Sequence, residues 1–308
     1  MRIAYAYRRN TFYPFKGGTS WGLPDERAVE SYLKKVNEIG FDGLELGLES
    51  FGGLEAAETP VRELQRMLEN AGTPCVSIRA GGGLCQPNVT AQNRRRLEKA
   101  VQIAGWIGAE IVNTALGTPP RNRTLGTTGV GNPVQPGSSQ LATEEDFIRT
   151  SRVLREVGEV AGASGVNITV EVHQHSIADS SWSTLHLLDL TDSPYVFANP
   201  DLGNIYWNLD VPEETMEEAI MALASRSKYW HCKSLYRVYI PEVDRSYFIR
   251  VPLPDGDIDY RFAISAMVEA GYDGYLALEG ANTGDQLYKD QRSVEYVKRV
   301  LKDIKADS

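Results

Sequence analysis

Four consecutive apolar segments in the second half of the chain each end in, or are closely followed by, an ionisable residue. The segments span residues 168–172, 196–199, 229–233 and 275–279, and the ionisable residues are Glu171, Asp201, His231 and Glu279. Three carboxylates drawn together would repel one another and raise their own pKa values unless a positive charge lay between them. Carboxylate oxygens with one imidazole suit divalent cations such as Mn, Mg, Co or Zn. For one residue alone a solvated strand end is the simpler interpretation, but four in succession indicate a site for one divalent metal ion.

Further polar residues beside these segments are candidates for contacting a substrate. His173 has the same side-chain parity as Glu171 along an extended strand, so both are expected to face the same way. A substrate contact or a proton-transfer role for His173 stands against a purely structural histidine. Lys233 and Arg237 could hold a substrate hydroxyl or a phosphate, although a solvated surface role suits Arg237 equally well.

Short β-rich apolar segments alternate with longer segments of helical period along the whole chain. This alternation is typical of repeated βα units and a parallel sheet. We expect eight strands, at residues 3–7, 43–47, 75–79, 111–115, 168–172, 196–199, 229–233 and 275–279, each followed by a helix. The pattern predicts an α/β protein in which a single (β/α)8 TIM barrel domain covers residues 1–308, with the metal site at the carboxyl ends of the last four strands.

Three connections are too long to be simple turns, and all three follow a strand and precede a helix. They comprise residues 8–24, 117–143 and 234–256, after strands one, four and seven. In this fold such loops lie at the face where catalytic sites are built. The first carries Phe12, Tyr13, Phe15 and Trp21, so an aromatic wall with Trp21 against the substrate and a lid from residues 117–143 are expected; a partner-binding surface is the alternative.

Composition bounds the function. Charged residues make up 24% of the 308 residues and hydrophobic residues 42%, as in an ordinary soluble enzyme. A formal net charge of −9 disfavours nucleic acid as a partner. Three cysteines form no CxxC pair, and neither a leader segment nor an apolar run long enough to span a membrane is recognisable. We therefore expect a cytoplasmic protein without a membrane partner.

The sequence resembles the xylose isomerase-like barrels, also described as sugar phosphate isomerases and epimerases, over essentially its whole length. The resemblance rests on Glu171-x-His173, Asp201-x-Gly203-Asn204, His231-x-Lys233, Glu279 and the glycine-containing segment 251–259. It implies that Glu171, Asp201, His231 and Glu279 bind one divalent ion, with Mn favoured over Mg, Co or Zn, and that Glu171 and Glu279 double as acid/base groups. The chemistry agrees, because a metal chelating adjacent carbonyl and hydroxyl oxygens stabilises the enediolate formed when a carboxylate removes the α-proton.

The resemblance favours a metal-dependent isomerase or epimerase acting on a free sugar or polyol. A lyase with the same site is the main alternative, either a cyclitol dehydratase or the catalytic subunit of a C-glycoside deglycosidase. The first interpretation goes with a homo-oligomer, and the deglycosidase with a small β-sheet partner subunit. A DNA-repair endonuclease with three zinc ions is disfavoured because the chain has four histidines in all. A barrel that binds a ligand without chemistry is disfavoured by the complete set of four ligands.

Overall fold

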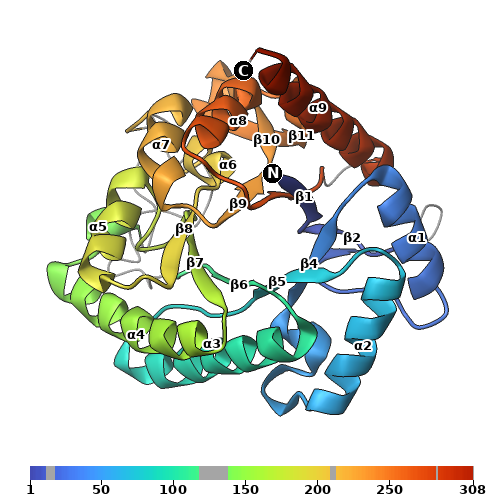
Figure 1. Cartoon of the computed structure of the whole chain (residues 1–308). Helices are drawn as coiled ribbons and strands as arrows, with labels where there is room; N and C mark the ends of the chain where they lie inside the picture. The colour runs from blue at the N-terminus through green and yellow to red at the C-terminus, as the bar shows by residue number, and fades with distance from the viewer. Residues whose placement is uncertain (12–17, 118–137, 209–212, 282–283, 308) are drawn as a thin grey trace.

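Eight parallel strands form the central sheet of the computed structural model, which describes all residues except 12–17, 118–137, 209–212, 282–283 and 308 (Figure 1). Along the sheet the order is β8-β7-β6-β5-β4-β1-β12-β9. The strands are β1 (Arg2–Tyr5), β4 (Gly43–Gly47), β5 (Cys75–Arg79), β6 (Ile111–Thr114), β7 (Asn167–Glu171), β8 (Val196–Asn199), β9 (Tyr229–Cys232) and β12 (Tyr275–Leu278). The two end strands of this order meet through a parallel bridge between Ala198 and Ser227, so the sheet curls into a nearly closed barrel.

Helices surround the barrel and follow its strands in turn (Figure 1). They are α1 (Val29–Ile39), α2 (Glu58–Asn70), α3 (Pro87–Ile107), α4 (Glu144–Ala163), α5 (Ser181–Thr191), α6 (Leu202–Tyr206), α7 (Met216–Leu223), α8 (Tyr260–Glu269) and α9 (Gln286–Asp307). Single turns of 3-10 helix lie at Leu48–Phe51, Gly53–Glu55, Ser139–Leu141, Ala224–Arg226, Pro241–Val243 and Leu253–Asp255. Among the helices that the structure describes, none is long and apolar enough to cross a membrane.

The predicted (β/α)8 architecture is confirmed, and all eight predicted strands are present. Five of them end one or two residues earlier than their apolar runs, although Val172 and Glu279 still donate backbone hydrogen bonds to Asn199 and Cys232 of the neighbouring strands. Val172, Lys233 and Glu279, for example, lie just beyond the ends of β7, β9 and β12. Polar residues such as Lys233 and Glu279 thus lie at the carboxyl ends of the strands.

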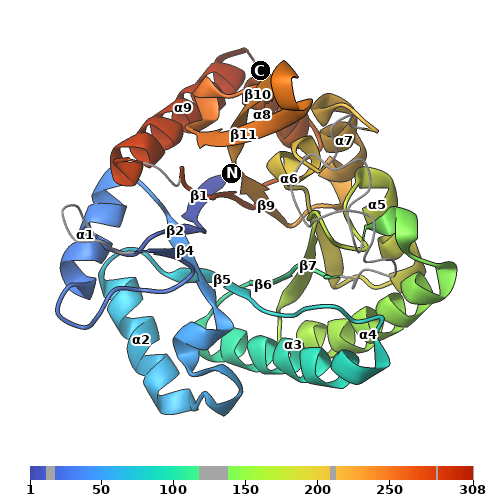
Figure 2. The same ribbon diagram turned by 180° about the vertical axis from the view of Figure 1, so that it is seen from behind.

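Residues 234–251 fold as an antiparallel hairpin where the sequence indicated only a long connection. Strands β10 (Ser234–Ile240) and β11 (Arg245–Val251) pair along their whole length and lie near α8 and α9 (Figure 2). Aromatic and β-branched residues are frequent in both segments, as is typical of strands. One face carries the exposed Tyr236, Val238, Tyr247 and Ile249, whereas Arg250 projects from the other. The first long connection also contains a short pair, β2 (Arg8–Arg9) with β3 (Thr19–Ser20).

A buried pair joins the first strand to the last helix. The hydroxyl of Tyr5 in β1 donates to Oδ2 of Asp290 in α9 at 2.5 Å, and the amide of Ala281 donates to the other carboxylate oxygen at 3.1 Å. Burial raises the pKa of Asp290 to about 7, although these two hydrogen bonds oppose the shift. The pair thus ties the segment after β12 to the barrel through a carboxyl that stays protonated in mildly acidic solution.

The raised pKa makes stability depend on pH. An unfolded aspartate ionises near pH 4, so the contribution of Asp290 is fully present below about pH 4 and is lost as the pH rises through about 7. Asp290→Asn keeps the size and an acceptor but does not ionise, so it should flatten the fall in unfolding free energy between pH 5 and 8. Urea denaturation at both pH values measures this, with the exposed Asp25→Asn as control. An Asp290→Asn protein with the pH dependence of the wild type would contradict the assignment.

Candidate metal centre

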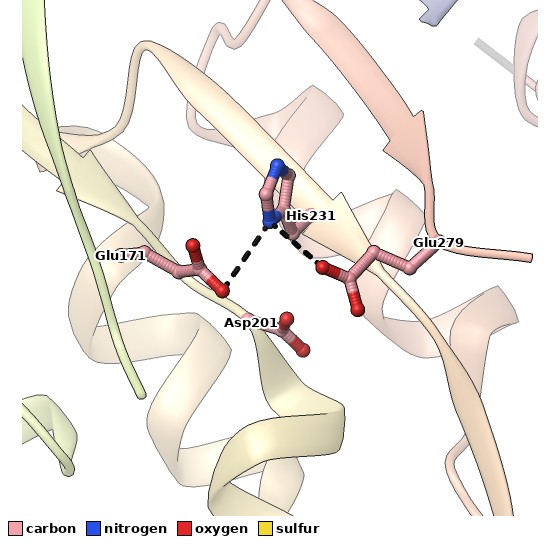
Figure 3. A group of neighbouring side chains, drawn as sticks. All are labelled: Glu171, Asp201, His231 and Glu279. Carbon is pink, nitrogen blue, oxygen red and sulfur yellow. Dashed lines mark ion pairs between the residues drawn. The ribbon is translucent and has the colours of Figure 1, made fainter. Parts of the chain in front are cut away.

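The four predicted ligands lie together at the carboxyl ends of four neighbouring strands (Figure 3). Glu171 is the last residue of β7, Asp201 caps α6 just after β8, His231 lies in β9, and Glu279 follows β12. One potential ligand atom from each lies within 4.8 Å of all the others. Three of these side chains are fully buried, and Glu279 is 7% exposed. The structure therefore brings all four residues into one compact, water-excluded cluster.

The imidazole of His231 is oriented by a carboxylate that lies outside this set of four. Its Nε2 lies 2.8 Å from Oε2 of Glu45 in β4, on the opposite side of the barrel. Its Nδ1 lies 3.4 Å from Oε1 of Glu171 and 3.5 Å from Oε1 of Glu279 (Figure 3). Nδ1 is buried, and no described residue forms a hydrogen bond with it. Glu45 thereby holds Nε2 and leaves Nδ1 facing the centre of the cluster.

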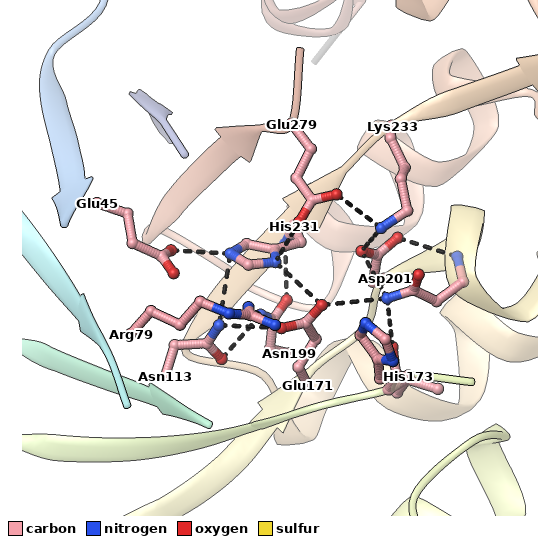
Figure 4. A network of polar contacts seen from close by, with 12 residues as sticks. Glu45, Arg79, Asn113, Glu171, His173, Asn199, Asp201, His231, Lys233 and Glu279 are labelled. Carbon is pink, nitrogen blue, oxygen red and sulfur yellow. Dashed lines mark hydrogen bonds and ion pairs between the residues drawn. The ribbon is translucent and has the colours of Figure 1, made fainter. Parts of the chain in front are cut away.

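Cations and an amide hold the carboxylate oxygens that point away from the centre (Figure 4). Arg79 forms an ion pair with Oε2 of Glu171, to which the amide of Asn113 also donates at 3.2 Å. The ammonium of Lys233 bridges Oδ2 of Asp201 at 2.5 Å and Oε2 of Glu279 at 2.7 Å. The inner oxygens of Glu171 and Glu279 remain directed at Nδ1. The cations thus contact the outer oxygens of Glu171 and Glu279, whereas both oxygens of Asp201 accept hydrogen bonds.

The pKa shifts at the centre have two main causes, which are burial and the charges of neighbouring groups. Burial raises the pKa of Asp201 to about 6, although Lys233 opposes the shift. For Glu279 burial acts in the same direction, but Lys233 and Arg250 outweigh it and hold the pKa at about 2. Burial disfavours a charged His231, yet Glu45 and Glu171 raise its pKa to about 10. Without a metal ion, the centre therefore keeps a proton on His231 as its positive charge.

The residues present fit a divalent cation. A buried imidazole nitrogen without a hydrogen bond faces carboxylate oxygens, which is the donor set that Mg²⁺, Mn²⁺ and related ions accept. The nitrogen of an imidazole that binds a metal ion carries no proton, so such an ion would take the place of the proton on Nδ1 of His231. The Glu45 contact at Nε2 is the partner that a metal-ligating histidine usually requires.

A layer of buried hydrogen bonds centred on Asn113 and Asn199 lies next to the cluster. Oδ1 of Asn113 accepts from Oγ1 of Thr169 at 3.1 Å and from Nδ2 of Asn199 at 3.0 Å. Oδ1 of Asn199 accepts in turn from the backbone amide of His231 at 2.6 Å. Because every member is buried and paired, the layer sets the height of β9 relative to β7 and β8.

The Gly-Asn of the Asp201 motif has a steric and a polar role. Nδ2 of Asn204 lies 2.9 Å from Oδ2 of Asp201 and 3.1 Å from Oε1 of Glu171, so one amide connects two of the carboxylates. A Cβ at Gly203 would lie 2.4 Å from Cγ of Lys233 and 2.8 Å from the Lys233 carbonyl. Only glycine lets α6 approach β9 closely enough for Lys233 to pass beside it.

Three of the four predicted substrate-contacting residues lie at the centre. Trp21 stacks on the His231 ring at 5.8 Å with an interplanar angle of 16°. Nδ1 of His173 lies 2.7 Å from the carbonyl of Gln174, and burial lowers the His173 pKa, so the neutral ring presents Nε2 as an acceptor. Lys233 is engaged by two carboxylates, as described above. Arg237 instead donates from Nε to Ser246 within the hairpin at 2.8 Å.

Glu45, Arg79 and Arg250 were missed by the sequence reasoning. Glu45 and Arg79 lie in early strands, each as a single charged residue in a largely apolar segment. Their partners, His231 and Glu171, are 186 and 92 residues away in the sequence, so the local pattern did not indicate them. Their strand positions, with parity toward the axis, are the signal that could have found them. Phe12, Tyr13, Phe15 and most of the predicted 117–143 lid lie outside the described residues.

Comparison with known proteins places this geometry in a family. A family model described as xylose isomerase-like TIM barrel matches residues 33–302. The chain belongs to this family. A xylose isomerase-like TIM barrel protein from Mycobacterium smegmatis, in complex with magnesium, superimposes with a TM-score of 0.76 at 21% identity, covering 98% of this chain and 97% of that one. At this identity the likeness shows a shared fold.

Two curated relatives of this xylose isomerase-like barrel carry different activities. An L-ribulose 3-epimerase of Mesorhizobium japonicum is 25% identical over 258 residues, covering 82% of this chain and 75% of the epimerase. An inosose dehydratase of Clostridium perfringens is 25% identical over 149 residues, covering 45% of this chain and 48% of the dehydratase. The chain thus spans about half the length of the dehydratase that it matches.

The donor set leads to a prediction about metal content. The purified protein should hold about one divalent ion per chain, because the carboxylates otherwise rely on a proton and on neighbouring cations for compensation. His231→Ala should weaken binding without unfolding the barrel, since His231 lies at the rim of the packed core. Elemental analysis and thermal shift on adding Mn²⁺ or Co²⁺ test both. If the protein holds no metal and shows no thermal shift with either ion, the assignment of the metal centre is wrong.

The Glu45 contact leads to a second prediction. Glu45→Ala should weaken Mn²⁺ binding about 10–100-fold, because the carboxylate behind a histidine ligand fixes its orientation. Glu45→Gln keeps an acceptor for Nε2 and should lose less. Equilibrium dialysis with Mn²⁺ measures both, with the exposed Glu49→Ala as control. Equal affinity in Glu45→Ala and the control would show that Glu45 does not position His231.

Proposed function

We propose that this protein is a divalent-metal-dependent isomerase or epimerase acting on a free sugar or polyol. The observation that carries the proposal is the pairing of Glu171 and Glu279 on opposite sides of Nδ1 of His231 (Figure 3). Two carboxylates on either side of one centre suit removal of a proton from one face of a carbon and its return to the other. The match to an epimerase over 82% of the chain supports the same reaction type.

The chain's own residues would act on the substrate in distinct ways. Glu171 and Glu279 would exchange the proton next to the carbonyl, each through the oxygen that faces the centre. Lys233, between Asp201 and Glu279, would keep those carboxylates ionised and in place. Trp21 would cover the reacting carbon and exclude water. A bound divalent ion would polarise the carbonyl and lower the energy of the enediolate.

A lyase is the second candidate, and His173 is the observation that favours it. Its Nδ1 is occupied by the Gln174 carbonyl, so the free Nε2 is an acceptor beside Glu171 (Figure 4). In an elimination, the acceptor Nε2 could take up the proton from the carbon next to the carbonyl and then, as an imidazolium, return it to the departing group. The partial match to an inosose dehydratase is in keeping with a dehydration.

We further propose Mn²⁺ as the resident ion, a carbohydrate substrate and a cytoplasmic location. We propose assembly as a homo-oligomer, or with a small β-sheet subunit if the reaction is a deglycosylation.

The acid/base roles are tested by Glu171→Gln and Glu279→Gln. Each should lower turnover at least about 10²-fold, because a positioned general base contributes about 10²–10⁴-fold. Turnover is measured at saturating Mn²⁺ with metal occupancy determined in the same samples, and the exposed Glu49→Gln serves as control. Activity within a few fold of the wild type at full occupancy would overturn the assignment.

The reaction type is tested by His173→Ala in deuterated water, with ketoses and 3-keto-glycosides as substrates. An isomerase or epimerase should still produce deuterated epimer or aldose, because Glu171 and Glu279 suffice to move the proton. A lyase should release an aglycone or form an alkene, and that release should depend on His173. His186→Ala, in which the histidine lies on α5 beside Glu144, is the matched control. No exchange of hydrogen with any polyol would argue against enolate chemistry altogether.

A further inference from the structure

The hairpin of β10 and β11 sends one arginine into the metal centre. Arg250 projects from the inner face of β11, and its Nη2 lies 3.3 Å from Oε2 of Glu279. Its guanidinium carbon lies 5.6 Å from the centre of the Tyr7 ring and 5.3 Å from that of Trp207. The side chain is 15% exposed. Two aromatic rings and an ion pair thus fix a cation at the mouth of the site.

One nitrogen of this guanidinium has no partner. Nη1 of Arg250 is buried and forms no hydrogen bond with any described residue. A buried donor left unpaired costs about 1–3 kcal/mol, and more when the group is charged. Most such groups in native proteins have a partner, so an unpaired one beside a reactive centre indicates a ligand that is bound during function.

The charge balance of the centre indicates the sign of that ligand. Among the described residues, ion pairs join four carboxylates (Glu45, Glu171, Asp201 and Glu279) to Arg79, Lys233, Arg250 and His231. With a divalent ion bound and His231 neutral as its ligand, these four negative charges face the three cations Arg79, Lys233 and Arg250 and the two charges of the ion, which leaves one positive charge in excess.

Enolisation by itself cannot balance this excess. When a proton moves from the substrate to Glu171 or Glu279, the total charge of site and substrate does not change. A negative charge that arrives with the substrate would compensate it. A carboxylate meets both requirements, because it carries the charge and offers an acceptor oxygen to the guanidinium.

Resting on the proposed function, we propose that Arg250 binds a carboxylate of the substrate through Nη1, so that the substrates of this centre are sugar acids with the carboxylate close to the reacting carbon. Arg237, which the sequence suggested for this role, lies on the same face of the hairpin but is engaged elsewhere, with Nε on Ser246 and its backbone amide on Asp257. The hairpin thus selects the charge of the substrate, and the strand ends carry out the proton transfer.

The test uses two three-carbon probes and one mimic of the reaction intermediate. Glycerate carries a carboxylate next to a hydroxyl, dihydroxyacetone is uncharged, and glycolohydroxamate resembles an enediolate. Affinities for the Mn²⁺-loaded wild type, Arg250→Met, Arg250→Gln and Arg237→Met are measured by calorimetry at neutral pH. Arg245→Met, exposed on the same strand, is the control. Circular dichroism and Mn²⁺ affinity of each variant are recorded alongside.

The proposal expects the wild type to bind glycerate at least about tenfold more tightly than dihydroxyacetone. Arg250→Met and Arg250→Gln should each lose at least about tenfold in the affinity for glycerate relative to that for dihydroxyacetone, with both affinities measured at full Mn²⁺ occupancy. Arg245→Met and Arg237→Met should keep the preference. If one Arg250 variant does not fold, the other decides the result.

Three results would overturn it. The first is a wild type that binds glycerate no more tightly than dihydroxyacetone. The second is an equal loss of affinity for both small probes in the Arg250 variants. The third is a loss of affinity for glycolohydroxamate alone, which would mean that Arg250 contacts only a charge formed in the reaction. The probes need not turn over, so these results are independent of the deuterium exchange that tests the proposed function.

Discussion

Repulsion among buried carboxylates is the constraint around which the rest of the site is organised. Glu171, Asp201 and Glu279 meet at the carboxyl ends of their strands, and Glu45 approaches the same imidazole from across the barrel. Buried charges of one sign are costly unless opposite charges or hydrogen bonds compensate them. The cations, the amide layer and the unpaired Nδ1 of His231 all follow from that requirement.

The compensation is arranged by direction. Arg79, Lys233 and Arg250 contact the outer carboxylate oxygens, so no cation occupies the inner oxygens of Glu171 and Glu279, although that of Glu171 accepts from the amide of Asn204. Had the cations entered the centre itself, they would have taken the place of a metal ion. The geometry therefore favours a site that is stable without the ion and ready to receive it, which is the arrangement expected of a centre that is organised before it binds.

The barrel supplies the rigid part of the site, and the hairpin of β10 and β11 adds a separate element to it. Strand ends fix Glu171, His231 and Glu279 through hydrogen-bonded ladders and the amides below them. The hairpin packs against α6 through Phe248 on Tyr206 and adds Arg250 from a separate direction. The proposed proton transfer and the proposed substrate selection thus use different parts of the fold, as is common when loops vary on a constant barrel.

The sequence by itself determined the eight strands, the barrel and the four-residue cluster, because each depends on a local pattern: an apolar run, its period and the ionisable residue at its end. Parallel strands of one barrel end at one face, so order along the chain was enough to bring those ends together. Only the tertiary structure decided which second residues join them. Glu45 meets His231 across 186 positions, and Arg250 rather than Arg237 reaches Glu279. Such pairings depend on barrel closure and on the facing of a hairpin, neither of which leaves a mark in the local sequence.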